Sequence, residues 1–403
     1  MLREINGIPV IQVREGKTKI YVPDPKLYTR DNGLLEPAWS PVFYNPRMEF
    51  SRDMAVAVLA ALKEMNTYFD LCIDPLSGTG IRGLRYANEP GNVRKVIIND
   101  INPIAYEFMK NNIELNKLES KVEAYNFDAN MLLYLIPMIE GRPDFIDIDP
   151  FGSPIPFIDA ALHAIRNEGV IAITATDIAP LTGTKEAACR RRYFSRTLKA
   201  DFDKELGIRI LIASIALRAA AKDLCIEPVL SYYADHYYRS YLLIKRGAKK
   251  ADAMLDEYLG YIIYDKNRLC KYVVKGYPLT EIIKLKNFIE DKYEVLGPLW
   301  ISKLCDINII KGILKVASDL VLNTSYRVVK LTETLIEESE IEEPYYYRID
   351  LVCSKLRCSM PKLTKIIECL RSKGYKASRT HFDPRGIKTN AEYEELVKCI
   401  RSS

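Results

Sequence analysis

A glycine-rich segment near residue 80 of this 403-residue chain carries side chains that could hold a ligand. The segment, Asp74-Pro-Leu-Ser77-Gly78-Thr-Gly80-Ile-Arg-Gly83, follows an apolar run and opens a helical pattern. Glycines at a strand-to-helix turn let the backbone approach a ligand closely, and the helix N-terminus favours a polar or anionic group. The segment therefore predicts a cofactor-binding turn that includes Asp74, Ser77, Gly78 and Gly80. A glycine turn without any ligand is the alternative.

Two cofactors fit this turn. Gly78, Gly80 and Gly83 match the dinucleotide pattern G-x-G-x-x-G, which favours a nicotinamide-dependent oxidoreductase. The same geometry also serves S-adenosylmethionine (SAM). Asp74 discriminates between the two, because a carboxylate there would repel a pyrophosphate but can receive the methionine ammonium. Asp100 ends the next strand-like run, where we expect it to accept hydrogen bonds from ribose hydroxyls.

A third acidic residue, Asp128, ends the following strand-like run. In a SAM site this position lies near the adenine, where the carboxylate accepts from the exocyclic amino group and the next backbone amide donates to a ring nitrogen. A helix cap is the alternative for Asp128 considered alone. Acids at three consecutive strand ends favour SAM more than any one of them does.

The segment DIDPFGSP ends the fourth strand-like run and contains Asp149-Pro150-Phe151. This trio suits methylation of an exocyclic amino group, whose lone pair is delocalised into the ring. A carboxylate that accepts from one N–H, with the proline carbonyl accepting from the other, stabilises the positive charge that develops on nitrogen. The aromatic ring can stack on a base that has flipped out of its helix. An ordinary Asp-Pro turn is the alternative.

Strand and helix patterns alternate from about Arg52 to Ile244. Ser51 is a plausible N-cap for a helix through MAVAVLAALKEM, and Asn102 with Pro103 begins another helix. This alternation predicts an α/β class, a doubly wound Rossmann-like parallel sheet with helices on both faces. Aromatic runs near residues 230–245 predict an antiparallel hairpin that closes the sheet.

The remainder of the chain has a different pattern. Residues 348–374 predict a helix-turn-helix, with Pro361 at the first turn of the second helix and Gly374 as its stop. A strand-like YKASRTHF and a DPRG turn follow, so we expect a smaller α+β domain with a winged element. We expect a catalytic domain over residues 1–250 and a nucleic-acid-binding domain over residues 251–403.

Composition excludes several classes of protein. No apolar leader or spanning segment is visible, and the longest apolar stretch, Gly207 to Cys225, is interrupted by charges. Nine cysteines are scattered without zinc-ligand spacing, which predicts reduced thiols in a cytoplasmic protein and no metal site. The net charge of +5 permits a nucleic-acid partner without requiring one.

Seven blocks of the sequence together resemble the tRNA (guanine-26,N2)-dimethyltransferases of archaea and eukaryotes. They are VFYNPRMEFSRD, DPLSGTGIRGLR, NDINP, DIDPFGSP, TATDIAPLTG, LGPLW and ASRTHFDPRGIKTNA. The resemblance implies SAM-dependent transfer of two methyl groups in succession to guanine N2. By matching motif, it implies that the SAM contacts are Arg52, Arg82, Asp100, Asp128 and Ala129. It also implies that Asp149 is the catalytic carboxylate and that Phe43 and Phe151 clamp the guanine.

The chain departs from that family's pattern in one respect. Many members carry paired cysteines, spaced for zinc, just before the GPLW block, whereas this chain has only Cys270 before it and Cys305 after it. We therefore expect no metal. Without the resemblance, Phe43 would be interpreted as a core aromatic. Arg52 can contact the SAM carboxylate from its helix, with a surface arginine as the alternative.

Two basic groups are candidates for contact with tRNA phosphates. The residues concerned are Arg190, Arg191, Arg192, Lys376, Arg379, His381, Arg385 and Lys388. A solvated cationic face is the alternative. A non-enzymatic interpretation, a nucleic-acid-binding regulator that senses SAM, also stays open. We expect no membrane partner; a monomer is the simplest expectation, although the sequence does not determine the oligomeric state.

Overall fold

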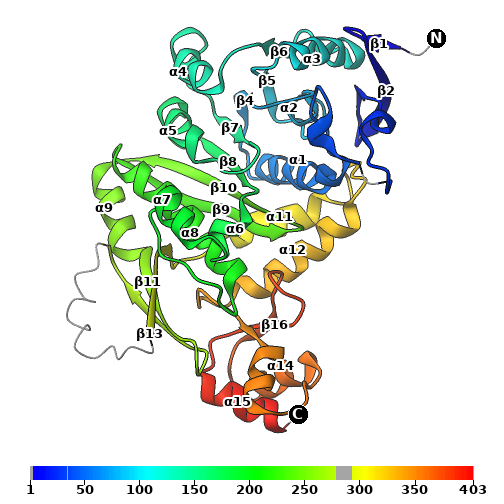
Figure 1. Cartoon of the computed structure of the whole chain (residues 1–403). Helices are drawn as coiled ribbons and strands as arrows, with labels where there is room; N and C mark the ends of the chain where they lie inside the picture. The colour runs from blue at the N-terminus through cyan, green and yellow to red at the C-terminus, as the bar shows by residue number, and fades with distance from the viewer. Residues whose placement is uncertain (1–2, 34, 278–292, 403) are drawn as a thin grey trace. The chain divides into compact units, whose positions relative to one another are not determined.

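The chain is described by a computed structural model that covers residues 3–33, 35–277 and 293–402 (Figure 1). Its contacts divide it into two compact units. Unit 1 comprises Met1–Pro150, Pro156–Ile173 and Asn308–Thr332, and unit 2 comprises Phe151–Ile155, Thr174–Ile307 and Glu333–Ser403. This division has no single boundary near residue 250, because the chain leaves and re-enters each unit.

Unit 1 is built on parallel strands in the order β6-β5-β4-β7-β8. Their bounds are β4 Phe69–Asp74, β5 Val93–Asn99, β6 Val122–Tyr125, β7 Phe145–Ile148 and β8 Val170–Ala175. This order confirms the predicted doubly wound α/β fold. The strand order reverses between β4 and β7, so the crevice for a ligand is expected at the carboxyl ends of those two strands.

Helices follow the strands of unit 1 in the predicted alternation. They are α1 Glu49–Glu64, α2 Ile81–Asn88, α3 Pro103–Asn116, α4 Ala129–Ile139 and α5 Ile155–Ala164. The side chain of Asn102 accepts from the Ile104 amide at 2.9 Å, which confirms the predicted cap of α3. The cap predicted at Ser51 is wrong: Ser51 is buried inside α1. The chain already turns at Asn45, whose side chain caps the short helix η3 Pro46–Met48.

Two outlying segments complete unit 1. An antiparallel sheet is formed at the start of the chain by β1 Glu4–Ile5, β2 Ile8–Glu15 and β3 Thr18–Pro23. Helix α11, Ile307–Val316, packs on α1 so closely that a Cβ at Gly312 would lie 3.2 Å from that of Ala61. Just before α12, Ser325–Ser339, the hydroxyl and amide of Thr324 both donate to Asp53, at 2.6 and 2.7 Å.

Unit 2 contains the predicted antiparallel hairpin, formed by β9 Leu224–Ala234 and β10 Tyr237–Arg246. Among the described residues before 308, its other helices and strands are α6 Ile178–Leu181, α7 Glu186–Tyr193, α8 Asp203–Ala220, α9 Ala248–Glu257, β11 Leu259–Asp265, β12 Cys270–Lys275 and β13 Tyr293–Trp300. In β12 the ammonium of Lys271 is buried, 2.8 Å from Asp201 and 3.9 Å from the centroid of the Tyr347 ring. Burial lowers the pKa of Lys271, although Asp201 opposes that shift.

The end of unit 2 has the predicted helix-turn-helix and wing. Its elements are β14 Tyr347–Arg348, α13 Ile349–Leu356, α14 Leu363–Ser372, β15 Ala377–Arg379, β16 Gly386–Thr389 and α15 Tyr393–Ser402, with the strands ordered β14-β16-β15. The turn at DPRG is closed by a hydrogen bond from the Gly386 amide to the Asp383 carbonyl at 2.9 Å. Helix α14 begins at Leu363, so Pro361 precedes the helix and does not lie in its first turn.

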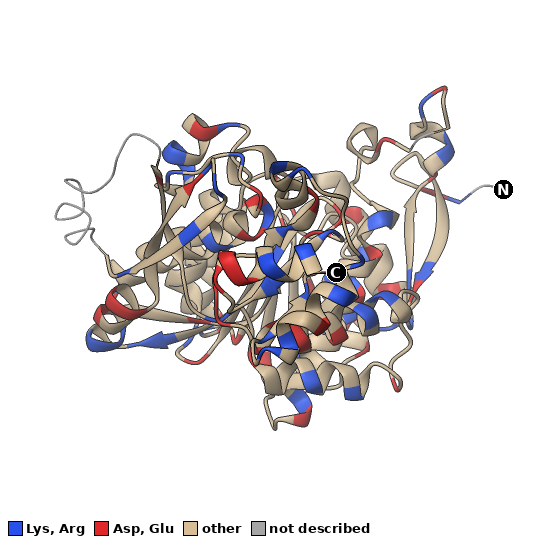
Figure 2. Ribbon diagram, turned by 90° about the horizontal axis from the view of Figure 1, so that it is seen from below, with Lys and Arg blue, Asp and Glu red and all other residues tan. Residues whose placement is uncertain are grey.

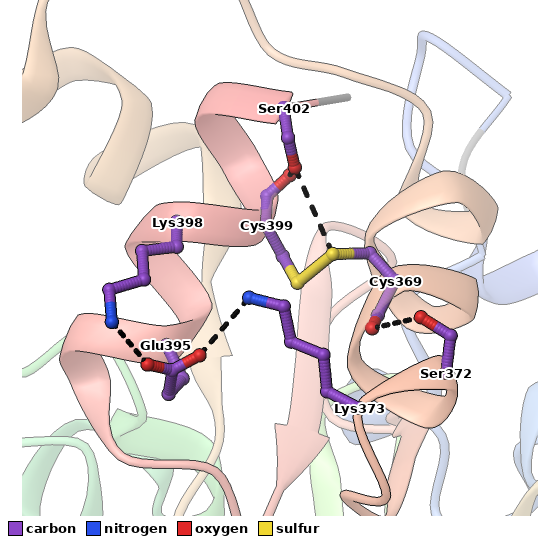
Figure 3. Close-up of a disulfide and its surroundings, with 7 residues drawn as sticks. All are labelled: Cys369, Ser372, Lys373, Glu395, Lys398, Cys399 and Ser402. Carbon is purple, nitrogen blue, oxygen red and sulfur yellow. Dashed lines mark hydrogen bonds and ion pairs between the residues drawn. A yellow bond between two sulfur atoms is a disulfide. The ribbon is translucent and has the colours of Figure 1, made fainter.

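A disulfide joins α14 to α15 (Figure 3). Cys369 and Cys399 are 30 residues apart in sequence, and their Cα atoms are 5.7 Å apart. The prediction that the thiols are all reduced is therefore wrong for this pair. Short-range spacing carries no signal for it, because folding of the two helices brings the cysteines together.

Within the described ranges, α14 and α15 included, no helix is long and apolar enough to cross a bilayer.

Candidate active site

The glycine turn connects β4 to α2 as predicted. Gly78 and Gly80 have φ of 54° and 83°, a region that other residues rarely adopt. A Cβ at Gly78 would lie 2.9 Å from the Phe43 carbonyl oxygen, and a Cβ at Gly83 would lie 2.2 Å from the side chain of Ile98. The glycines therefore let the turn pass against the Phe43 backbone and let α2 pack on β5.

Asp74 lies at the end of β4, where it is almost fully buried. Its Oδ2 accepts from the Gly83 amide at 3.1 Å, whereas its Oδ1 is buried and makes no hydrogen bond to any described residue. Burial, and then the negative charge of Asp147, raise the pKa of Asp74 to about 7, although Arg82 opposes this shift. A buried acceptor without a donor is costly. The site therefore fits a ligand that brings an ammonium group.

Asp100 fastens the turn to the next strand end. Its Oδ2 accepts from the Gly78 amide at 2.8 Å and its Oδ1 from the Asn102 amide at 2.9 Å. A carboxylate has about four acceptor positions, so hydroxyl groups of a ribose could still be accommodated. The hydroxyl of Ser77 donates to the Asp74 carbonyl at 2.6 Å, so its proton is not available to a ligand.

Asp128 is the N-cap of α4. Its Oδ1 accepts from the amides of Asn130 and Met131, at 2.9 and 3.0 Å. The helix-cap alternative is thus what the carboxylate does in this structure, and its contact with an adenine stays a prediction. Ala129, the first residue of α4, is buried.

Arg52 is a buried residue of α1 and not a surface arginine. Its Nε and Nη2 donate to both oxygens of Glu15, at 2.7 and 2.6 Å, and its Nη2 also donates to the Asn45 carbonyl at 3.0 Å. The hydroxyl of Tyr44 donates to the same carboxylate at 2.8 Å. Burial raises the pKa of Glu15, but Arg52 and Arg85 outweigh it and lower the pKa overall. This network anchors the loop that carries Phe43.

Asp149 follows β7, and an arginine of α2 holds it. The Nη2 of Arg82 donates to the Oδ2 of Asp149, while its Nη1 lies 3.8 Å from Asp147. Asp147 also accepts from the hydroxyl of Tyr86. Since Arg82 lies two residues after Gly80, the helix opened by the glycine turn contacts the carboxylate predicted to do the chemistry. The resemblance implied a SAM contact for Arg82; its observed partners are these acids.

The other predicted reaction-site residues differ in exposure. Pro150 is buried, Phe43 is half-buried in its loop, and the ring of Phe151 is 70% exposed. An exposed aromatic ring next to the predicted catalytic carboxylate suits stacking on a base. Phe43 belongs to unit 1 and Phe151 to unit 2.

The predicted nucleic-acid contacts divide into exposed and buried residues. The exposed ones are Arg190, Arg191, Arg192, Lys376, Arg379 and Arg385. Figure 2 shows that acidic residues are interspersed among the basic ones along the described chain. Arg192 accordingly pairs with Asp177 at 3.1 Å, and Arg385 pairs with Asp350 at 2.9 Å.

His381 and Lys388 are not presented to solvent. The ring of His381 lies 2.5 Å from a carboxylate oxygen of Glu338, and the ammonium of Lys388 pairs with Glu205. The side chains of both residues are about as buried as their partners, because the wing folds back onto α8 and α12. The spacing of basic residues along the sequence cannot distinguish these two positions from their exposed neighbours. His381 and Lys388 are therefore not part of the proposed tRNA interface.

No cluster of three or more His, Cys, Asp or Glu side chains that could hold a metal ion occurs within the described ranges. The absence of a metal site stays a prediction for the chain as a whole.

Sequence reasoning missed several groups that organise the site. Glu15 and Asp147 carry no signal in the sequence, since each is one of many acids near the end of a strand. Arg85 was also missed, although its i,i+4 spacing to Glu89 is visible; it pairs with Glu89 at 2.9 Å and with Asp53 at 2.7 Å.

Known proteins resemble this chain over nearly its full length. A family profile described as N2,N2-dimethylguanosine tRNA methyltransferase matches residues 16–401. A tRNA (guanine(26)-N(2))-dimethyltransferase of Saccharolobus solfataricus is 39% identical over 393 residues, which cover 97% of this chain and 98% of the relative. The enzyme of the same name from Aeropyrum pernix is 40% identical, covering 96% and 95% of the two chains.

Among solved structures, this chain is similar to Trm1 from Pyrococcus horikoshii in complex with S-adenosyl-L-methionine. The TM-score is 0.85 at 36% sequence identity, and the match covers 97% of this chain and 99% of that chain. These relatives support the SAM-dependent interpretation over an oxidoreductase or a non-enzymatic regulator. With matches over nearly its full length, the chain belongs to the N2,N2-dimethylguanosine tRNA methyltransferase family.

Proposed function

We propose that this chain methylates N2 of the guanine at position 26 of tRNA, first once and then twice, with SAM as the methyl donor. The observation that carries this proposal is the Arg82 contact. Arg82 lies in the helix that begins at the glycine turn and pairs with Asp149. This ion pair connects the predicted cofactor turn to the carboxylate predicted to react.

The residues of unit 1 fit SAM in several respects. The buried Oδ1 of Asp74 suits the methionine ammonium, and Asp100 suits the ribose hydroxyls. Asp128 and the amide of Ala129 suit the adenine. The positive φ of Gly78 and Gly80 lets the backbone approach the cofactor closely, and Arg52 is the further contact that the resemblance implies. When bound, SAM supplies a methyl group on a positively charged sulfur.

Asp149 is the residue we assign to the amino group. Its carboxylate accepts from one N–H of guanine N2 while the Pro150 carbonyl accepts from the other, which increases electron density on nitrogen. Each transfer would form the bond from N2 to the methyl carbon as the bond from that carbon to the SAM sulfur breaks, and the proton that N2 loses would pass to Asp149 and from there to solvent. After the first transfer N2 keeps one hydrogen, so the deprotonated Asp149 can act a second time. The exposed Phe151 is the aromatic residue that we assign to stacking on the guanine, and the resemblance implies the same role for Phe43.

Exposed basic residues of unit 2 serve the tRNA backbone in this proposal. Lys376, Arg379 and Arg385 form the group in and around the wing, and Arg190–Arg192 form the group on α7. Residues 251–403 would thus supply most of the tRNA-binding domain. We further propose that the enzyme acts in the cytoplasm, as a monomer, and without a metal ion.

The test is methyl transfer to a tRNA transcript, followed by mass spectrometry of its nucleosides. The wild-type protein should produce N2-methylguanosine and then N2,N2-dimethylguanosine. A transcript with inosine at position 26 should not react, because inosine lacks the amino group. Asp149→Ala should abolish transfer and leave SAM affinity nearly intact, whereas Asp70→Ala, a change at an exposed acid of β4, should leave both transfer and SAM affinity unchanged. Transfer to the inosine transcript, or full activity of Asp149→Ala, would contradict the proposal.

A further inference from the structure

The loop that carries Phe151 is held to a neighbouring loop of unit 2. Gly152 has φ of 79°, and it exchanges two hydrogen bonds with Thr176. The Gly152 amide donates to the Thr176 hydroxyl at 2.7 Å, and the Thr176 amide donates to the Gly152 carbonyl at 2.9 Å. This reciprocal pair fixes the backbone immediately after Phe151.

A second attachment runs through side chains. The hydroxyl of Tyr193 donates to the Oδ1 of Asp177 at 2.6 Å and lies 2.8 Å from the hydroxyl of Ser153. A tyrosine hydroxyl has one proton, so the Ser153 hydroxyl must donate to the Tyr193 oxygen. The result is a chain of hydrogen bonds in which Ser153 donates to Tyr193 and Tyr193 donates to Asp177. The Asp177 carboxylate ends this chain and also accepts from Arg192 at 3.1 Å.

The buried surroundings of Tyr193 favour this series of hydrogen bonds. Tyr193 is fully buried, and burial followed by the charge of Asp177 raises its pKa well above the usual value, so it stays a donor at any working pH. Burial also raises the pKa of Asp177, and the hydrogen bonds from Tyr193 and Arg192 oppose that shift. Hydrogen bonds inside a poorly hydrated site are stronger than those in water.

We propose that Tyr193, supported by Asp177 and Thr176, is a positioning residue: it fixes the loop of residues 151–155 and so holds the Phe151 ring where the target guanine stacks. The inference rests on the proposed function, in particular on the assignment of Phe151 to the base. None of these three residues needs to touch the guanine or SAM. Their effect is to spare the reaction the cost of ordering an exposed aromatic ring each time a tRNA binds.

Tyr193→Phe tests the inference because it removes a single oxygen. We expect kcat for methyl transfer to fall on the order of 10- to 100-fold, since misplacement by about 1 Å can cost a factor of that size. The KM for SAM and the Kd for tRNA should stay within about twofold of the wild-type values. With 2-aminopurine at position 26 of the transcript, fluorescence should report a base that is less well held by the variant.

Tyr238→Phe is the matched control. Tyr238 is also a fully buried tyrosine of unit 2, but its hydroxyl makes no hydrogen bond to any described residue. Its replacement should leave kcat and the 2-aminopurine signal unchanged. Asp177→Asn keeps an acceptor for Tyr193 and should retain more activity than Asp177→Ala when the two are compared at a temperature at which both are folded. Thermal unfolding of each variant checks folding, and Ser153→Ala replaces Tyr193→Phe if the latter does not fold.

Different outcomes would refute the role of Phe151 and the positioning role of Tyr193. A full kcat for Phe151→Ala would overturn the assignment of Phe151, and with it the proposed clamp. If Phe151→Ala lowers kcat while Tyr193→Phe and Ser153→Ala both keep the wild-type value, the proposed function survives and the positioning role is refuted. A loss of SAM affinity equal to the loss of kcat would also refute it.

Discussion

We predict that Asp74 makes the affinity of this protein for SAM depend on pH. In the unliganded protein, burial and the charge of Asp147 raise the pKa of Asp74 to about 7. Only the ionised carboxylate can pair with the methionine ammonium. The raised pKa of the free protein means that protonation competes with the ligand, so affinity must fall as the pH falls through 7.

The expected size of this effect follows from the fraction of ionised Asp74. With a pKa of about 7, roughly half of the molecules are ionised at pH 7 and about one in eleven at pH 6. Apparent Kd varies inversely with the competent fraction, so it should rise about fivefold between pH 7 and pH 6, or about 1 kcal/mol. Below pH 7 the ammonium of the ligand itself stays protonated, since α-amino groups titrate near about 7.7–8.0.

Isothermal titration calorimetry at pH 6.0, 6.5 and 7.0 measures this dependence directly. Asp74→Asn should bind SAM more weakly than the wild type at pH 7 and should lose the pH dependence. Methylthioadenosine, which lacks the ammonium and the carboxylate, is the control ligand and should bind equally at the three pH values. A flat SAM profile for the wild type, or the same slope in Asp74→Asn, would refute the assigned role of Asp74.

Two further predictions concern unit 2. Replacing Arg379 and Arg385 with Ala should weaken tRNA binding and reduce the slope of log Kd against log salt by about one for each phosphate that is no longer neutralised. Lys388→Met is the control: it breaks the buried pair with Glu205, so it should lower the unfolding temperature and leave that slope unchanged. Replacing Cys369 and Cys399 with Ser should destabilise the C-terminal region by at most about 3–4 kcal/mol, the loop-closure value for a separation of 30 residues, and dithiothreitol should then have no further effect on unfolding measured by circular dichroism.

The fold and the positions of the acids could be predicted from sequence because both follow local rules. Apolar strands of a doubly wound sheet end at one edge, so Asp74, Asp100 and Asp128 were expected at consecutive strand ends, and each lies at or just after the end of β4, β5 or β6. The cap at Asn102 followed in the same way from its proline neighbour. Each of these predictions depends on residues close together in the chain.

The features that sequence reasoning missed depend on contacts between distant segments. Glu15 holds Arg52 across 37 positions, and Cys369 meets Cys399 across two helices. His381 and Lys388 alternate with exposed residues in the sequence, yet the wing turns them onto Glu338 and Glu205. A count of basic residues along the chain cannot report which of them already have a partner.

The strand-end acids show why residue type alone does not assign a role. Asp100 and Asp128 accept hydrogen bonds from backbone amides, and Asp149 pairs with an arginine. Asp74, in contrast, has one carboxylate oxygen without a donor among the described residues. Arg82 is the cation shared by Asp147 and Asp149, so the buried Asp74 beside them is left with excess negative charge, which adds to the effect of burial in raising its pKa. A proton or a ligand ammonium can each compensate that charge, but not both at once. We therefore infer that the electrostatic imbalance that costs stability in the free protein is also what favours a cationic cofactor at Asp74.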